Sequence, residues 1–222
     1  MERSQLVVLI PAYREARTIG PVVQAAAAVA PVIVVDDCSP DDTGAEARKA
    51  GAQVHRNARN LGYDGTLNQA FELARAGGFA CAVTMDADGE HDPGLLANFA
   101  ELLCDRQVPL VLGIRPRKQR LAELVMGLYI KARFGVDDIL CGMKGYHLDL
   151  LNANGRFDNS DSIGTELAIN SIRRGARFEQ IQVHGTPRAD APRFDRRLRA
   201  NLRIFAALWR VFRQDVGAGE AR

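Results

Sequence analysis

The sequence predicts an α/β fold with a mostly parallel central sheet, and two observations predict it. Short apolar runs with the character of strands alternate along the chain with longer, helix-like segments. This alternation is typical of a parallel sheet whose strands are joined by right-handed helical crossovers. In addition, residues 32–35 and 79–85 are apolar or small along almost their whole length, as expected for strands that are buried on both faces.

Local signals place the elements in order. Pro11 stops the first strand, Gly51 closes the second helix as a C-cap residue, and Gly77 ends the third. Asp92 caps the helix that starts at Pro93. Beyond residue 115 the alternation loosens. We expect strands at 6–10, 32–35, 53–55, 79–85, 110–113, 141–147 and 178–183, and helices at 18–29, 41–50, 65–76, 93–104, 121–134 and 165–174.

Composition indicates an ordinary globular protein. Hydrophobic residues make up 47% of the 222 residues and charged residues 25%. The net charge of +2 does not indicate a nucleic-acid partner. Four cysteines without C-x-x-C spacing, and a start without a signal-peptide pattern, predict reduced thiols and a cytoplasmic location. No apolar run approaches the ~20 residues of a membrane span, so we expect a chain that does not cross a bilayer but can lie on one.

Two acidic clusters follow apolar strands, and they are the strongest functional signal. Asp36 and Asp37 follow the 32–35 strand, and Asp86-Ala87-Asp88 follows the 79–85 strand. Ligands of open α/β sheets bind beyond the carboxyl ends of the strands. The D-x-D spacing on an extended backbone directs both carboxylates to one side, where they can share Mg²⁺ or Mn²⁺ with diphosphate oxygens. The alternative is a pair of helix caps, a role that Asp92 already fills.

Other polar segments allow both a structural and a functional interpretation. Pro11 to Glu15 is either a plain turn or a shelf for a nucleobase, with Tyr13 stacking and Glu15 accepting a hydrogen bond. Ser39 or Asp41 can cap the 41–50 helix. The glycines of residues 60–65 suit a turn and a helix N-terminus that could face phosphates, although no P-loop sequence is present.

Three charged residues in the second half are candidates for catalysis. Arg115 ends a strand and is well placed for a phosphate. Asp138 could hold the sugar, act as a base or serve as a structural hydrogen-bond acceptor. Glu166 opens a helix, where it either complements the helix dipole beside a capping Thr165 or forms the floor of an acceptor site.

The C-terminal segment has an amphipathic pattern with a strongly basic face. One helical stripe is apolar: Leu198, Leu202, Phe205, Trp209 and Phe212. A neighbouring face is basic: Arg196, Arg199, Arg203, Arg210 and Arg213. Such a helix suits an anionic membrane surface. The alternative, that it docks on its own domain or on a second subunit, is slightly favoured because most amphipathic helices face a core.

Taken together, these motifs resemble family 2 glycosyltransferases of the GT-A fold, and most closely the dolichol- and polyprenyl-phosphate sugar transferases. The resemblance covers about residues 5 to 190, and its motifs occur in the right order. They are V-V-L-I-P-A-Y-R-E, V-I-V-V-D-D-C-S-P-D-D-T, R-N-L-G-Y-D-G-T-L-N-Q-A, V-T-M-D-A-D-G-E-H-D-P, V-L-G-I-R and D-I-L-C-G-M-K-G-Y.

The resemblance implies a three-layer α/β sandwich and a role for each matching residue. It implies that Asp37 binds the nucleotide, that Asp86 and Asp88 hold Mg²⁺ or Mn²⁺, and that Arg115 contacts phosphate. Glu90 stands where relatives carry Gln or Ser near the metal, so it is a third candidate ligand. The segment with Ala87 belongs to the donor site, and the nucleobase segment matches at Pro11, Tyr13 and Glu15.

The implied reaction is inverting transfer of a sugar from a UDP- or GDP-sugar to an acceptor, which we expect to be polyprenyl or dolichyl phosphate. Such a role belongs to cell-envelope biosynthesis. The alternatives are a glycan or other hydroxyl acceptor in polysaccharide biosynthesis, for which Asp138 or Glu166 would be the base, and a sugar nucleotidyltransferase, whose Gly-rich segment is lacking. We expect the transferase domain at residues 1–187 and a basic tail at 188–222, with contact to the inner face of the cytoplasmic membrane.

Overall fold

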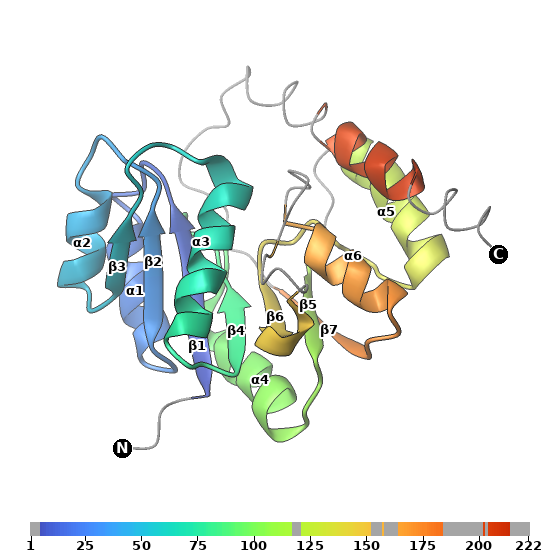
Figure 1. Cartoon of the computed structure of the whole chain (residues 1–222), viewed down its shortest axis with the longest axis horizontal. Coiled ribbons are helices and arrows are strands. Elements are labelled where there is room, and N and C mark those ends of the chain that lie inside the picture. The colour runs from blue at the N-terminus through green and yellow to red at the C-terminus, as the bar shows by residue number, and fades with distance from the viewer. Residues whose placement is uncertain are drawn as a thin grey trace.

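A computed structural model describes residues 5–116, 121–151, 157, 164–183, 202 and 204–213. Its centre is a seven-stranded sheet with the order β3-β2-β1-β4-β6-β5-β7 (Figure 1). The strands are β1 (Leu6–Ala12), β2 (Val32–Asp36), β3 (Gln53–Arg56), β4 (Cys81–Thr84), β5 (Leu110–Ile114), β6 (Lys144–His147) and β7 (Phe178–Gln182).

The sheet is mostly parallel, as expected, but it contains one reversed strand. β6 pairs antiparallel with β4, where Thr84 lies opposite Lys144, and antiparallel with β5, where Leu112 lies opposite Lys144. The other strand pairs are parallel. As a result, the start of β6 lies at the edge of the sheet where its parallel neighbours end.

Helices cover both faces of the sheet, which confirms the α/β architecture. The α-helices are α1 (Ile19–Ala27), α2 (Thr43–Lys49), α3 (Gly62–Ala76), α4 (Leu96–Ala100), α5 (Leu121–Phe134) and α6 (Glu166–Arg173). Three shorter segments are the 3₁₀ turns η1 (Pro93–Leu95) and η3 (Leu148–Leu150) and the π-helical turn η2 (Glu101–Asp105). Residues 204–213 form a further helix, which lies along α5 in Figure 1.

Alternating side chains of the buried strands divide the core into two layers. Val8 and Ile10 of β1 pack with α1, α2 and α4 on one face, whereas Val7 and Leu9 pack with α3, α5 and α6 on the other. The 204–213 helix joins the second layer through Ile204 and Val211. The continuous apolar runs of the sequence therefore correspond to strands that are buried on both sides.

The local predictions agree with the structure in element type, with a few differences. Gly51 has φ +102° after α2, and Asp92 accepts a hydrogen bond from the amide of Gly94 at 2.8 Å. The predicted helix end at Gly51 and the predicted cap at Asp92 are therefore confirmed. The expected 93–104 helix is divided among η1, α4 and η2. Thr165 occupies the N-cap position of α6, as expected, but its side chain makes no capping hydrogen bond.

All four cysteines are free, Cys81 and Cys141 being buried and the other two partly buried. Among the described residues, no helix combines the length and the apolar character needed to span a bilayer. Several tail residues of the predicted amphipathic pattern lie outside the described residues: Arg196, Leu198, Arg199 and Arg203.

Candidate active site

The candidate site lies where β1, β2, β4 and β5 end. In the register of the sheet, Ala12 lies opposite Asp36, and Leu9 opposite Thr84. The acidic clusters at the carboxyl ends of β2 and β4 are therefore gathered on either side of β1. The turn after β5, which carries Arg115, ends at the same edge. This is the carboxyl edge at which open α/β sheets bind ligands.

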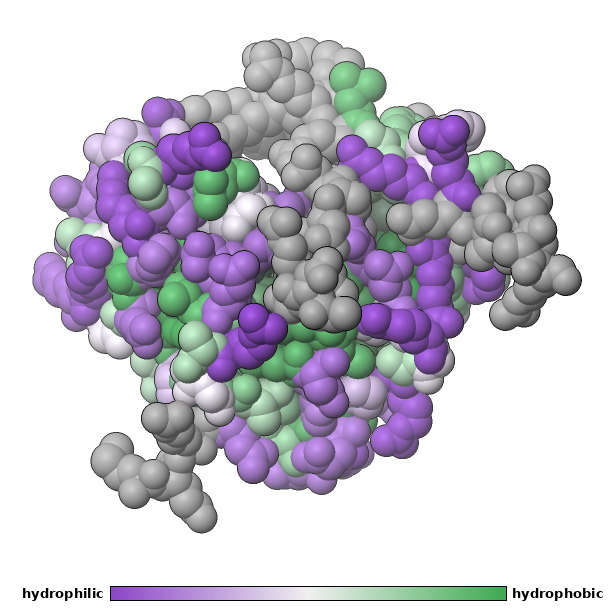
Figure 2. Space-filling model, in the orientation of Figure 1, coloured by the Kyte–Doolittle hydropathy of each residue, from purple (hydrophilic) through white to green (hydrophobic). Residues whose placement is uncertain are grey.

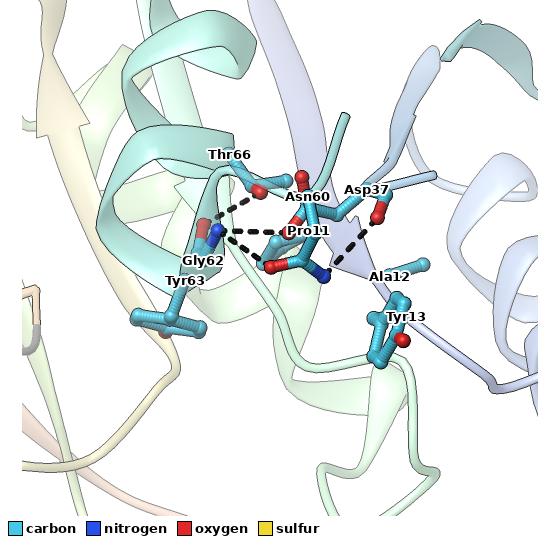
Figure 3. A pocket seen from close by; sticks show the side chains of 8 residues that line it. All are labelled: Pro11, Ala12, Tyr13, Asp37, Asn60, Gly62, Tyr63 and Thr66. Carbon is cyan, nitrogen blue, oxygen red and sulfur yellow. Dashed lines mark hydrogen bonds between the residues drawn. The ribbon is translucent and has the colours of Figure 1, made fainter. Parts of the chain in front are cut away.

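A pocket of about 270 Å³ opens at this edge between the end of β1 and the start of α3 (Figure 3). Tyr13 and Tyr63 stand on opposite sides of it, with Asn60 and Asp37 between them. The lining residues are Pro11, Ala12, Tyr13, Asp37, Asn60, Gly62, Tyr63 and Thr66. Apolar walls and a few fixed polar groups are typical of a site for a small organic ligand.

Asp37 anchors the first turn of α3 at the back of the pocket. Its buried carboxylate accepts hydrogen bonds from Asn57 Nδ2 at 2.9 Å, from the amide of Leu61 at 2.8 Å and from the amide of Gly62 at 2.9 Å. Gly62 has φ +74°, a conformation that favours glycine. Asp37 therefore has a structural role that sequence reasoning did not assign, in addition to its place in the predicted nucleotide site.

Asp36, its neighbour, is fully buried and turned away from the pocket into an ion pair. Its carboxylate lies 2.5 Å from Arg56 Nη1 and accepts a hydrogen bond from the amide of Ser39 at 2.9 Å. Asp41 in turn accepts hydrogen bonds from Thr43. The second aspartate of the pair at the end of β2 thus faces the ligand pocket, and the first holds β2, β3 and the following turn together.

Asp86 and Asp88 occupy the loop that follows β4. The Asp86 side chain is 34% exposed, with His91 Nε2 at 3.7 Å and the Tyr63 hydroxyl at 3.4 Å. The backbone amide of Asp86 donates to His91 Nδ1 at 3.1 Å, so the ring proton belongs on Nε2, facing the carboxylate. Asp88 accepts a hydrogen bond from the amide of Glu90 at 3.0 Å. Burial and the charge of Asp86 raise the pKa of Tyr63, which keeps its hydroxyl protonated.

The oxygen donors of this loop suit a hard divalent cation. Gly142 supports the fit, because a Cβ at this position would collide with the carboxylate of Asp86, so the chain leaves room for that side chain. Within the described part of the chain, however, no group of three or more His, Cys, Asp and Glu side chains is placed to hold a metal. Glu90 is therefore not brought together with Asp86 and Asp88, and a cation here would depend on two carboxylates.

Arg115 and Asp138 form a bidentate ion pair on the other side of the site, in which Asp138 is buried and Arg115 is partly exposed. Arg115 Nε and Nη2 donate to the Asp138 carboxylate at 2.7 and 3.1 Å, and Glu123 lies 3.8 Å from Nη2. Burial alone would raise the pKa of Asp138, but the hydrogen bonds and charge of Arg115 outweigh it and lower that pKa. A carboxylate held in this way is a weak base, so the geometry favours the structural alternative for Asp138.

Lys144 is a buried cation to which sequence reasoning gave no role. It is 3% exposed at the start of β6, and its Nζ donates to the carbonyl of Gly164 at 3.1 Å. Burial lowers its pKa. The amide of Gly164 donates to the buried Asp64 at 2.6 Å. A lysine within an apolar, strand-like run was the signal that could have identified it, since lysines are almost never buried without a purpose.

The structure brings some of the predicted donor residues together and separates others. Pro11, Tyr13 and Asp37 share the pocket, whereas Glu15 is not among its lining residues and accepts a hydrogen bond from the Thr18 hydroxyl at 3.0 Å. Ala87 is buried in the first core layer. Glu166 follows the Gly164 turn as the first residue of α6. Tyr63 and Asn60 are pocket residues that the sequence suggested mainly as turn chemistry.

This fold, with its pocket at the carboxyl edge, is of the GT-A type found in nucleotide-sugar transferases. The chain belongs to glycosyl transferase family 2, whose family model matches residues 7–126. It is 29% identical over 174 residues to undecaprenyl-phosphate mannosyltransferase of Micrococcus luteus, a match that covers 68% of this chain and 70% of that protein.

A second relative is polyprenol monophosphomannose synthase of Mycolicibacterium smegmatis, which is 27% identical over 166 residues. That match covers 65% of this chain and 62% of the relative. Among solved structures, glucosyl-3-phosphoglycerate synthase from Mycobacterium tuberculosis, in complex with phosphoglyceric acid, superposes with a TM-score of 0.75 at 22% identity. The superposition covers 93% of this chain and 79% of that one, and shows that the two share a fold.

Proposed function

We propose that this protein is an inverting glycosyltransferase that moves a sugar from a nucleotide-sugar donor to polyprenyl phosphate. One observation carries the proposal. In a member of family 2, a pocket with Asp37 at its back adjoins the Asp86 and Asp88 loop, at the sheet edge that also carries Arg115. Such an edge has a place for a nucleobase in the pocket and a place for a diphosphate beside the acidic loop, with the guanidinium of Arg115 beyond them.

The pocket is suited to the nucleoside. Tyr13 is 39% exposed at its rim and can stack on a base, while Pro11 and Ala12 supply an apolar wall. Two of the relatives are named as mannosyl-group transferases, and a structural neighbour was solved with Mn²⁺, UDP and phosphoglyceric acid. Both UDP- and GDP-sugars are therefore the donors to test.

The diphosphate belongs at the rim, where Asp86 and Asp88 would hold Mg²⁺ or Mn²⁺. A bound divalent cation would neutralise the leaving diphosphate. The chain's own contribution is to keep the Asp86 carboxylate in place beside the Tyr63 hydroxyl and His91. Gly142 provides the space that this carboxylate occupies.

The acceptor side favours a phosphate. A hydroxyl acceptor needs a base, but Asp138 is ionised and held by Arg115. A phosphate is already anionic near neutral pH, and Arg115, whose side chain is 26% exposed at this edge, is the cation proposed to meet it. Its oxygen attacks the anomeric carbon from the face opposite the nucleotide. The bond from that carbon to the diphosphate oxygen breaks, and its electron pair leaves with the nucleoside diphosphate.

A thermal-shift panel tests the donor half. We expect one UDP- or GDP-sugar to raise the melting temperature only when Mn²⁺ or Mg²⁺ is present. Asp88→Asn should lose this shift, whereas Asp105→Asn, an exposed aspartate in η2, should keep it. Absence of a shift with every donor, or an unchanged shift in Asp88→Asn, would contradict the proposed donor site.

A transfer assay tests the acceptor half. Labelled sugar should move to polyprenyl phosphate but not to polyprenol, and Glu166→Gln should retain most of this activity because a phosphate needs no base. If the enzyme instead glycosylates a glycan hydroxyl, and Glu166→Gln abolishes that transfer, the hydroxyl-acceptor alternative is correct.

A polyprenyl phosphate is anchored in a bilayer, so we also propose that the protein works in peripheral contact with the inner face of the cytoplasmic membrane, in cell-envelope synthesis. The basic residues and aromatic side chains of the 204–213 helix support this proposal. Flotation of the protein with vesicles is its direct test.

A further inference from the structure

Exposed apolar side chains gather on two neighbouring helices. α5 contributes Leu124, Val125 and Leu128, of which Leu128 is 63% exposed. The C-terminal segment contributes Leu202, Phe205, Trp209 and Phe212, of which Trp209 is 59% exposed. These seven residues are called the two-helix surface below. Figure 2 shows green side chains over this part of the molecule, with purple ones beside them.

The two helices are in direct contact, so their exposed residues form one surface. The rings of Tyr129 on α5 and Phe212 are 6.0 Å apart, and Phe212 stacks on Trp209 at 5.9 Å. Figure 1 shows the 204–213 helix lying along α5. A contiguous apolar surface of this kind marks an interaction site more often than isolated exposed residues do.

Docking on the protein's own core does not explain this surface. The 204–213 helix packs inward through Ile204, Ala207 and Val211, and Arg173 of α6 donates to the carbonyl of Val211 at 2.9 Å. The aromatic stripe that the sequence singled out therefore faces outward. α5 likewise buries Ala122, Met126 and Ile130 and remains apolar on its outer side. A helix that has apolar side chains on its outer as well as its inner side is expected to meet a second apolar partner.

The charges around the surface indicate which kind of partner it binds. The described residues of the two helices include four basic residues, Lys131, Arg133, Arg210 and Arg213, and one acidic residue, Glu123, which is 3% exposed. The guanidinium of Arg213 lies over the Trp209 ring at 5.9 Å, and Lys131 pairs with Asp137. Outward-facing aromatic and leucine side chains bordered by cations fit an anionic lipid surface.

The position of the surface connects it to the candidate site. α5 joins the end of β5 to the start of β6, and both lie at the carboxyl edge of the sheet. Its first turn carries Glu123, which lies 3.8 Å from Arg115. The helix that presents Leu124 and Leu128 thus begins beside the cation proposed to meet the acceptor phosphate.

We propose that the two-helix surface, to which α5 contributes three of the seven apolar residues, docks the enzyme on an anionic membrane. It turns the carboxyl edge of the sheet toward the lipid headgroups. This inference rests on the proposed function, because it names the surface from which a lipid-phosphate acceptor arrives. A second copy of the chain is disfavoured as the partner. Two copies would bring their basic residues together, and the described residues of the two helices include no exposed acidic side chain that could pair with them.

Flotation with vesicles tests the inference. The full-length wild type should float with vesicles of equimolar phosphatidylcholine and phosphatidylglycerol, and much less with phosphatidylcholine alone or at high salt. Leu128→Glu should need at least about tenfold more lipid for the same binding, because it places a charge in the bilayer interface. The double variant Trp209→Ala, Phe212→Ala should show the same loss of vesicle binding as Leu128→Glu. Val29→Glu is the matched control, because Val29 is 42% exposed and lies shortly before β2, at the opposite edge of the sheet.

The outcomes separate this inference from the proposed function. Leu128→Glu should keep its melting temperature and its metal-dependent shift with the donor, whereas Asp88→Asn should lose the donor shift and still float. The inference is overturned if the wild type does not float with anionic vesicles, or if Leu128→Glu floats as the wild type does. It is also overturned if the surface instead pairs two copies, seen as a dimer in gel filtration that Leu128→Glu dissociates.

Discussion

At the residue scale, the partners of each carboxylate decide which chemistry it can perform. Asp36 and Asp138 are buried and paired with Arg56 and Arg115, so they stabilise the site and have little capacity left for a ligand. Asp86 is partly exposed, and the polar contacts of its carboxylate with described residues are long, 3.4 Å to Tyr63 and 3.7 Å to His91. The acidic pair after β4 is therefore better prepared for a cation than the pair after β2.

The space beside Asp86 gives a sharp substitution test. Gly142→Ala places a methyl group where the Asp86 carboxylate lies, so that side chain must move. We expect the metal-dependent donor shift to fall by most of its size while the fold is retained. Gly20→Ala is the matched control, since a Cβ there meets nothing within 4 Å, and it should leave the shift unchanged. An equal shift in both variants would show that Asp86 does not need this position.

The Arg115–Asp138 pair predicts a pH-dependent stability. Because the folded pKa of Asp138 is lowered, its contribution is fully present above its unfolded pKa of about 3.9 and is lost as the pH falls through the folded value. Asp138→Asn should reduce the free energy of unfolding by about 3 kcal/mol at pH 7, because it leaves Arg115 without its main partner. Urea titrations of both proteins should show this difference shrinking below about pH 4. A difference that stays constant down to acid pH would refute the assignment.

The sequence predicted the site unevenly at this scale. Asp37, Tyr13 and Pro11 could be found because they lie in or directly after the last residues of strands, and position in the chain fixes which edge they occupy. The pairing of Asp138 with Arg115, across 23 positions of sequence, could not be found, because it depends on how the chain returns through α5 to β6. Lys144 was hidden for the same reason, since its burial follows from the reversed strand.

At the element scale, periodicity predicted the helices and strands well but not which side of a helix faces inward. The tail stripe of Leu202, Phe205, Trp209 and Phe212 has helical spacing, and such a stripe usually faces a core. Here the smaller side chains Ala207 and Val211 are buried and the aromatic stripe is exposed. Hydrophobic spacing gives the same pattern whether the partner is a core or a bilayer, so only the packing of α5 and α6 distinguishes the two.

One arginine fixes the C-terminal helix on the domain. Arg173 of α6 donates to the carbonyl of Val211 at 2.9 Å and lies over the Phe134 ring at 5.6 Å. Arg173→Ala should speed amide exchange in residues 204–213 by roughly tenfold, the effect of losing one charge-assisted hydrogen bond. Arg177→Ala, an exposed residue after the same helix, is the control. Unchanged exchange in Arg173→Ala would mean that apolar packing alone holds the helix.

At the scale of the whole molecule, one edge of the sheet unites segments that are far apart in sequence. The pocket at β1 and α3, the acidic loop after β4, Arg115 after β5 and Lys144 at the start of β6 all lie at this edge. The strand order and the register of β6 bring them there. The two-helix surface begins at the same edge through α5, so the proposed donor site, the proposed acceptor cation and the proposed membrane contact follow one another along it.

This arrangement predicts how the length of the acceptor's polyprenyl chain affects the rate of transfer by a docking-deficient variant. Leu128→Glu should strongly reduce transfer to polyprenyl phosphate embedded in anionic vesicles, because the enzyme no longer docks there. Transfer to a short, water-soluble polyprenyl phosphate should stay within about twofold of the wild type, because the site itself is intact. Comparison of initial rates with the two acceptors checks this. An equal loss with both would indicate that Leu128 supports the site rather than the docking.

The proposed function requires that the carboxyl edge binds a nucleoside diphosphate through a divalent cation held by Asp86 and Asp88. Anomalous diffraction from crystals grown with manganese and the preferred nucleoside diphosphate tests it most directly. We expect one manganese peak between these two carboxylates and the diphosphate oxygens, with the nucleobase beside Tyr13. A nucleotide bound in the pocket with no manganese at Asp86 and Asp88 would contradict it.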